Sequence, residues 1–334
     1  MAAWNSGCGN QCEGMRVAQP AVPFRGVIPA IGSPCGVRDD FDEDSFSRLA
    51  SWLMEEQVSG LYVGGLTGEG YQMTLDERKK AVEIAVKMCG SKLAIMAHVG
   101  TQDSRMTSTL AAHAAEVGAH GVAAIPPVSR PFPEIESYYR ELVSAAGGLP
   151  VYIYYIPVYN KWEATFDQLV RLSEIVGVSG IKFTDYNLLL MRRLASMRSD
   201  FSVLYGRDEQ FAAALGLGSR GGVGSTYNVF PRAFVAMQLA VDGGRVEEAF
   251  QIQRIVTDAI ILMENFGVMA CIEAILAKTG VIQAMRRKPC RRLSSADAAG
   301  MCSQLKVILE RLPAHAQKQL CSSTLTCCNF PPQR

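Results

Sequence analysis

Short apolar runs alternate along the chain with longer amphipathic stretches, beginning near residue 24. Eight such runs occur, and each has the length of a buried strand. They cover residues 26–31, 60–64, 93–99, 121–125, 151–156, 177–183, 201–205 and 221–224. Because these runs are continuously apolar rather than alternating, they are typical of parallel strands that are buried on both faces.

Amphipathic stretches of helix length separate the runs. They lie near residues 42–57, 75–89, 103–117, 132–146, 165–176, 187–198 and 208–217. Thr74 and Glu77 fit a capping box, and Thr165 and Gln168 fit one more loosely. The alternation of strands and helices therefore predicts an α/β fold, a closed (β/α)8 TIM barrel. An open, doubly wound sheet is the structural alternative.

The chain continues well beyond the eighth run. Further helical stretches are expected near residues 230–243, 245–264, 267–279 and 294–311. They exceed the one helix that the barrel still requires, so the sequence predicts a C-terminal helical extension. The expected organisation has four parts: a flexible leader over 1–23, the barrel over 24–243, the extension over 244–312 and a disordered tail over 313–334.

Composition narrows the class of protein. The chain has 334 residues, of which 49% are hydrophobic and 19% charged, so a large core can be buried. A net charge of +1 gives no electrostatic reason to expect binding to nucleic acid or to acidic membranes. No apolar run reaches the ~18 residues of a membrane helix. The N-terminus lacks the pattern of a secretory signal.

The ten cysteines do not form a recognisable framework. Only Cys8 and Cys12 have a spacing that suits a metal site, and no second pair or histidine accompanies them. We therefore expect no bound metal and free thiols in a reducing cytoplasm.

Candidate chemistry is sought where strands end, because TIM-barrel enzymes carry their active sites at the carboxyl ends of the strands. Lys182 ends the sixth apolar run. Burial there would disfavour the ammonium form and lower the pKa of the lysine, leaving a neutral amine that can attack a ketone. The alternative is a lysine whose amine reaches solvent.

Other strand ends also carry polar groups with two interpretations each. Tyr154 could be a packed core tyrosine or, beside an imine, a proton relay. The glycine-rich turn around Thr67 could bind a carboxylate or serve only as a tight connection. Asp208 and Glu209 could bind substrate or cap the following helix.

Five segments carry a resemblance to a known family. GLYVGGLTGEG, YYIP, GIKFTDYNLL, GRDEQ and GGVGSTYN resemble, in order and spacing, the N-acetylneuraminate lyase and dihydrodipicolinate synthase family of pyruvate-dependent class I aldolases. The similarity extends over about residues 24–312. It implies that Lys182 forms a Schiff base with the keto acid and that Tyr154 transfers protons. It also implies that Thr67, with the backbone amides of Leu66 and Thr67, binds the carboxylate.

The sialic acid lyase branch of that family is the most similar. It implies that Thr184, Gly206, Asp208, Glu209 and Ser225 contact the sugar-acid substrate. It further implies a small-molecule keto acid or sugar acid as the substrate, no metal or organic cofactor, and a homotetramer.

Three features depart from the family pattern. Leu66 replaces the usual serine or threonine before the motif threonine, which removes a side-chain donor. The loop over 126–130 lacks a tyrosine found in many relatives. The segment 158–161 differs from the usual sequence of the family. Tyr159 stands where dihydrodipicolinate synthases carry an arginine for a second carboxylate, so a dicarboxylate product is disfavoured.

Three functional hypotheses follow. The first is a lyase that cleaves N-acetylneuraminate into N-acetylmannosamine and pyruvate. The second is an aldolase or dehydratase that acts on another 2-keto-3-deoxy sugar acid, which Leu66 and the segment 158–161 favour. The third is a catalytically impaired relative that serves as a binding or scaffold protein, for which Leu66 is the only support.

Overall fold

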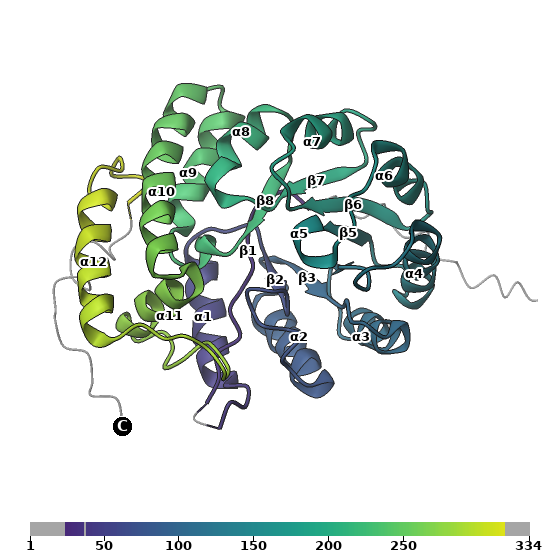
Figure 1. Ribbon diagram of the computed structural model, residues 1–334, viewed down its shortest axis with the longest axis horizontal. Helices are drawn as coiled ribbons and strands as arrows, with labels where there is room; N and C mark the ends of the chain where they lie inside the picture. The colour runs from purple at the N-terminus through teal and green to yellow at the C-terminus, as the bar shows by residue number, and fades with distance from the viewer. Residues whose placement is uncertain (1–23, 37, 318–334) are drawn as a thin grey trace, which may run out of the picture.

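The computed structural model describes residues 24–36 and 38–317. The predicted leader over 1–23 and residues 318–334 of the predicted tail lie outside the described residues. Eight parallel strands are surrounded by helices, as Figure 1 shows, and this confirms the predicted TIM barrel. The sheet closes because Ala30 bridges Tyr62, next to a hydrogen bond of 3.1 Å from the Ile31 amide to the Tyr62 carbonyl.

Every strand lies inside the apolar run that predicted it. The strands are β1 (Gly26–Pro29), β2 (Gly60–Val63), β3 (Ala94–His98), β4 (Gly121–Ala124), β5 (Val151–Tyr155), β6 (Val178–Phe183), β7 (Ser202–Tyr205) and β8 (Gly221–Gly224). Their hydrogen-bonded order is β1-β8-β7-β6-β5-β4-β3-β2. Consecutive strands are therefore neighbours, and all their carboxyl ends meet at one face of the barrel.

The helices that cover the barrel also follow the predicted stretches. They are α1 (Glu43–Glu55), α2 (Leu75–Cys89), α3 (Ser104–Glu116), α4 (Phe132–Ala145), α6 (Phe166–Ser173), α7 (Leu188–Ala195), α8 (Phe211–Gly216) and α9 (Pro231–Asp242). Both predicted capping boxes are present, at the starts of α2 and α6.

Two local predictions were incomplete. The sequence did not predict the single-turn helix α5 (Pro157–Asn160), which begins at a proline, a residue well suited to the first helical position. The stretch predicted as one helix over 208–217 divides into the 3-10 turn η1 (Asp208–Gln210) and the short helix α8. A second 3-10 turn, η2 (Thr226–Asn228), follows β8.

Side chains on each strand alternate between two cores. On β5, Tyr152 and Tyr154 belong to the cluster inside the barrel, whereas Val151, Ile153 and Tyr155 pack in the layer between strands and helices. On β6, Gly180 and Lys182 lie opposite Tyr152 and Tyr154. A methyl group at Gly180 would collide with the ring of Tyr152. Glycine at position 180 therefore leaves room for the ring of Tyr152 inside the barrel.

Three helices extend the chain beyond the barrel: α10 (Val246–Phe266), α11 (Val268–Lys278) and α12 (Ser295–Leu309). Helix α10 packs against α8, α9 and α12, and the extension flanks one side of the barrel in Figure 1. Within residues 24–36 and 38–317, no single helix is long and apolar enough to cross a membrane. Only α10 and α11 taken together, bent by 103° where they meet, reach the required length and composition.

Candidate active site

Lys182 lies at the mouth of the barrel, near the carboxyl end of β6. Its side chain is 4% exposed, and its Nζ atom lies 4.0 Å from the ring centre of Tyr154 and 4.4 Å from that of Tyr62. Burial lowers the pKa of Lys182 to about 7, and the negative charge of Asp208 opposes this shift. A large share of the lysine is therefore a neutral amine at neutral pH.

Tyr154 is the partner of Lys182 in the register of β5 and β6. Burial raises the pKa of the Tyr154 phenol above its usual value. The nearby hydroxyl of Thr184, which has no hydrogen-bond partner among the described residues, works against this rise. The phenol consequently keeps its proton at neutral pH and can donate it before it acts as a base.

The glycine-rich turn after β2 places Thr67 beside Ser225, which follows β8. The two hydroxyl oxygens are 2.6 Å apart. Neither the Leu66 amide nor the Thr67 amide donates a hydrogen bond to any residue that the structure describes. Two available N–H groups and a hydroxyl are a suitable set of donors for a carboxylate.

The turn has little conformational freedom. Gly64 has a φ of 72°, and a methyl group at Gly70 would collide with the carbonyl of Gly64. The carboxylate of Glu69 accepts hydrogen bonds from the Arg287 amide at 2.8 Å and from Arg286 Nε at 3.3 Å. These hydrogen bonds from the C-terminal extension therefore hold the turn in place from outside the barrel.

Asp208 is buried, with 7% of its surface exposed, and it faces the same mouth. Its Oδ2 atom accepts hydrogen bonds from the amide and the hydroxyl of Thr226, at 2.8 and 2.7 Å. Burial raises the pKa of Asp208 to about 6; the charge of Glu209 acts in the same direction and that of Lys182 against it. The carboxylate caps neither η1 nor α8, because neither has a side-chain cap. The capping interpretation was therefore wrong.

Gly206 connects β7 to this segment and lies against Thr184. Its amide donates to the Phe183 carbonyl at 2.9 Å, and a methyl group at this position would collide with the Thr184 hydroxyl. Glycine is therefore required where the ends of β6 and β7 approach each other. Thr184, Gly206 and Asp208 thus lie together beyond these two strands.

An aromatic wall on the opposite side of the mouth was not predicted from the sequence. Tyr71 stacks on Tyr159 with ring centres 5.7 Å apart, and it meets the ring of His98 edge-on at 5.6 Å. His98 in turn lies edge-on to Tyr154 at 5.9 Å. His98 ends β3, and position at a strand end was the one signal that could have identified it.

The buried imidazole of His98 is neutral. Burial, followed by the charges of Arg78 and Lys182, lowers the pKa of His98 well below its usual value. The tautomer with the proton on Nδ1 satisfies two contacts at once: Nδ1 donates to the Gly64 carbonyl at 3.1 Å, and Nε2 faces the Ile125 amide at 3.5 Å. His98 thereby connects the turn after β2 to the end of β4.

Two of the positions at which this chain departs from its relatives lie on this side of the mouth. Leu66 and Tyr159 are half-buried and pack against the cluster inside the barrel. Leu66 fills space with apolar atoms where a hydroxyl would offer a donor. Tyr159 offers a ring face and a phenol where an arginine would offer a positive charge.

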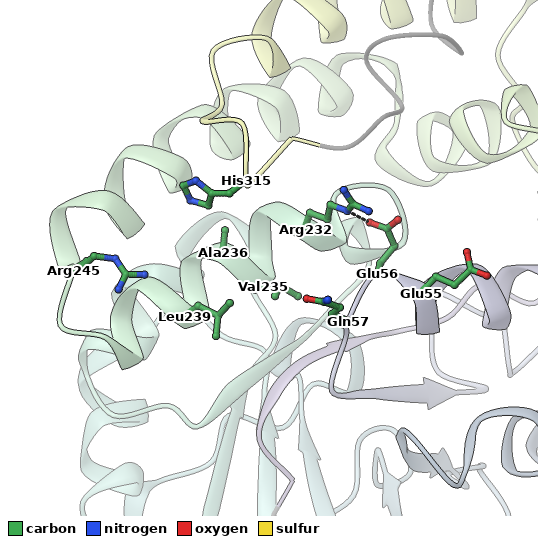
Figure 2. A pocket seen from close by; sticks show the side chains of 9 residues that line it. All are labelled: Glu55, Glu56, Gln57, Arg232, Val235, Ala236, Leu239, Arg245 and His315. Atoms are coloured by element: carbon green, nitrogen blue, oxygen red, sulfur yellow. Dashed lines mark hydrogen bonds and ion pairs between the residues drawn. The ribbon is translucent and has the colours of Figure 1, made fainter.

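A separate cavity of about 400 Å³ lies outside the barrel, between the end of α1 and helix α9 (Figure 2). Its lining includes Arg232, Arg245 and His315, and none of the predicted site residues. These three side chains are paired with carboxylates: Arg232 with Glu56 at 2.8 Å, and Arg245 and His315 with Glu248 at 2.7 and 2.9 Å. The cavity therefore lacks the unpaired buried amine that marks the barrel mouth.

Comparison with known proteins gives consistent results. The model of the dihydrodipicolinate synthetase family matches residues 23–308. An N-acetylneuraminate lyase of Enterobacter sp. (strain 638) is 33% identical over 272 residues, which cover 80% of this chain and 92% of the relative.

Solved structures agree in fold. The wild-type sialic acid aldolase of Ruminococcus gnavus aligns with a TM-score of 0.82 at 25% identity, over 88% of this chain and 98% of that protein. The same aldolase has also been solved as a mutant of its catalytic lysine. A Clostridium difficile protein, CdNal, in complex with mannosamine aligns with a TM-score of 0.81 at 25% identity, over 87% of this chain and 99% of that one.

Proposed function

The chain belongs to the dihydrodipicolinate synthetase family, and we propose that it cleaves N-acetylneuraminate into N-acetylmannosamine and pyruvate through a Schiff base on Lys182. Membership makes it a carbon–carbon lyase of the class I aldolase type. The observation that carries the proposal is the amine of Lys182, buried at the barrel mouth with a pKa of about 7. The catalytic lysine of the Ruminococcus gnavus relative supports the same chemistry here.

The first stage joins Lys182 to the substrate. The neutral Nζ atom attacks the C2 ketone and forms a carbinolamine. The Tyr154 phenol, which burial keeps protonated, donates its proton to the departing hydroxyl. Water leaves, a protonated imine remains between Lys182 and C2, and Tyr154 becomes a phenolate.

The second stage breaks the C3–C4 bond. The phenolate removes the proton from the C4 hydroxyl, whose oxygen becomes the aldehyde carbonyl of N-acetylmannosamine. The electron pair of the C3–C4 bond moves into the iminium system and produces an enamine. Protonation at C3 and addition of water at C2 then release pyruvate and restore the amine of Lys182.

Substrate binding divides between two sets of groups. We assign the pyruvate carboxylate to the Thr67 hydroxyl and to the free amides of Leu66 and Thr67, which suit an anion. We assign binding of the polyol tail to the residues that follow β6, β7 and β8, since several convergent acceptors suit a chain of hydroxyls. This group comprises Thr184, Gly206, Asp208, Glu209 and Ser225.

A second candidate keeps the imine chemistry and changes the substrate to another 2-keto-3-deoxy sugar acid. Leu66 and Tyr159 favour it, because both alter the wall against which the substrate would pack. The expected cytoplasmic location and the expected homotetramer remain predictions of the sequence.

Trapping of the imine tests the chemistry. The protein is incubated with pyruvate and borohydride, digested, and analysed by mass spectrometry for a reduced pyruvate adduct on Lys182. We expect the adduct in the wild type and in Lys87→Met, which removes an exposed lysine, and no adduct in Lys182→Met. Absence of the adduct from the wild type would contradict both candidates and leave a catalytically impaired relative.

Assays of pyruvate release then separate the two candidates. N-acetylneuraminate is compared with 2-keto-3-deoxy sugar acids that lack the acetamido group. Faster release from N-acetylneuraminate supports the first candidate, and faster release from the other acids supports the second.

A further inference from the structure

Helix α10 of the C-terminal extension contacts the segment that carries Asp208 and Glu209. We propose that Gln253 and Thr257 of this helix are positioning residues that fix these two carboxylates for the sugar chain of the substrate. The inference rests on the proposed function, because it concerns how the polyol tail is held. It assigns to the extension a part in substrate binding, from outside the barrel.

Gln253 uses every hydrogen-bonding group of its side-chain amide. The residue is 6% exposed. Its Nε2 atom donates to the Asp208 carbonyl at 3.1 Å and to the Thr257 hydroxyl at 3.1 Å, while its Oε1 atom accepts from the Ala212 amide at 2.8 Å. Only this orientation of the amide matches donors to acceptors at all three partners, so the side chain cannot flip without losing them.

Thr257 extends the contact by one residue. Its hydroxyl accepts the hydrogen bond from Gln253 and donates its own proton to the Glu209 carbonyl at 3.2 Å. Gln253 and Thr257 are four positions apart and therefore lie on one face of α10. Two successive turns of this helix thus hold the backbone carbonyls of two successive residues, Asp208 and Glu209.

The segment needs this external support because it cannot provide its own. Helix α8 has six residues, and no side chain of its own caps its first turn. The first amides of a helix lack partners within the helix, and buried amides without partners cost stability. Gln253 supplies the missing acceptor to Ala212 from a different helix.

The same support determines where the Asp208 carboxylate lies. The backbone of Asp208 is held by Gln253, and its Oδ2 atom is held by the amide and hydroxyl of Thr226. The residue is therefore fixed at both ends, and Oδ1 remains to meet a substrate hydroxyl. Lys182 and Tyr154 are instead held by strands β5 and β6. Loss of the Gln253 contact should therefore affect binding of the sugar chain more than formation of the imine.

Matched variants of α10 test the inference. Thr257→Val removes the hydroxyl at constant shape, and Thr257→Ser is its control because it keeps the hydroxyl. Gln253→Met removes the side-chain amide. Its control, Gln251→Met, makes the same change at an exposed position of the same helix. Gln253→Met should raise the KM for N-acetylneuraminate about tenfold, the loss expected for buried hydrogen bonds. Thr257→Val should raise it by less, and Thr257→Ser and Gln251→Met should retain the wild-type KM. The rate of pyruvate trapping on Lys182 should stay within about twofold in all four.

Two outcomes would overturn the inference. One is a lowered melting temperature in Gln253→Met with an unchanged KM, which would show a structural role alone. The other is a KM for Thr257→Ser as high as that for Thr257→Val.

A measurement without substrate separates this inference from the proposed function. Wild-type protein that releases no pyruvate from any sugar acid would contradict the proposed function alone. The positioning role is then judged by hydrogen exchange of the Thr226 amide, which donates to Asp208 Oδ2. Faster exchange in Gln253→Met than in Gln251→Met would support the role, and equal exchange would refute it.

Discussion

Two groups of side chains at the barrel mouth, called here the strand side and the connecting side, differ in how they are held. Lys182 and Tyr154 lie on adjacent strands, in register with each other, and both are buried. Leu66 and Tyr159 lie on connecting segments, the turn after β2 and the single-turn helix α5, and both are half-buried. Strand positions are fixed by hydrogen bonds to two neighbours, whereas connecting segments can change sequence without disturbing the sheet.

The difference explains why the reaction type is better defined than the substrate. The strand side matches the family pattern and carries the amine and the phenol that the proposed reaction requires. The connecting side carries the departures, and in TIM barrels such segments determine which substrate is accepted. If this division is correct, changes on the strand side should alter chemistry for every substrate, and changes on the connecting side should alter preference among substrates.

The largest effect is expected from Tyr154→Phe. The ring would still pack against Lys182, but the proton relay would be lost. We expect kcat to fall by about 10² to 10⁴ for every keto acid tested, the usual contribution of a general acid–base group. Turnover is measured by pyruvate release with N-acetylneuraminate and with a second sugar acid.

Tyr152→Phe is the matched control for this change. Tyr152 lies two residues earlier on β5, inside the same barrel, where its hydroxyl accepts a hydrogen bond of 2.9 Å from the Phe24 amide. Its loss should cost about 1 kcal/mol of stability and leave kcat unchanged. Equal losses of kcat in the two variants would refute a specific role for the Tyr154 hydroxyl.

The next effect concerns pH. Attack on the ketone needs the neutral amine, and burial lowers the pKa of Lys182 to about 7. The amine is neutral above this pKa and protonated below it, so imine formation should be fastest above pH 7 and slow as the pH falls. At pH 6 the rate of pyruvate trapping should be about a tenth of its plateau.

Asp208→Asn sharpens the pH test. The negative charge of Asp208 raises the pKa of Lys182, so its removal should shift the decline in trapping rate to lower pH. A decline centred near the usual lysine pKa would show that burial does not control the amine. No shift in the variant would show that the charge of Asp208 does not act on Lys182.

Much of the fold could be predicted from sequence because its pattern is local. Each apolar run contains its strand, and both capping boxes formed between residues three positions apart. The divided segment over 208–216 was not predictable in this way. Its first turn is completed by Gln253, which lies 41 positions after Ala212 in the sequence.

The site shows the same division. Lys182 and Tyr154 were predicted as site residues because each lies near the end of a strand, and the register of β5 and β6 places them opposite each other. The wall of Tyr71, His98 and Tyr159 was missed because it joins the turn after β2, the end of β3 and the helix α5. No short-range pattern links these residues, and only the closure of the barrel brings them together.

On the connecting side, Leu66→Ser should have a moderate effect in the favourable direction. It restores the hydroxyl that the family pattern has next to Thr67. We expect kcat/KM to rise by up to about tenfold, since one donor at a developing charge can contribute that much or more. Leu66→Ala is the control, because it removes the same apolar packing without adding a donor. A similar rise in both variants would indicate that relief of packing, and not the hydroxyl, is responsible.

The smallest effect is expected at Tyr159. Tyr159→Arg replaces a ring that stacks on Tyr71 with a positive charge, while Tyr159→Leu removes the ring alone. Because the position is half-buried, the added charge should favour a keto acid with a second carboxylate only about three- to fivefold. The measurement is the ratio of kcat/KM for an acidic and a neutral substrate in the two variants. Both variants lose the stacked pair of rings and should therefore lose similar stability. A preference for the acidic substrate that appears only in Tyr159→Arg would then arise from charge. An equal ratio in the two variants would mean that this wall does not select the substrate.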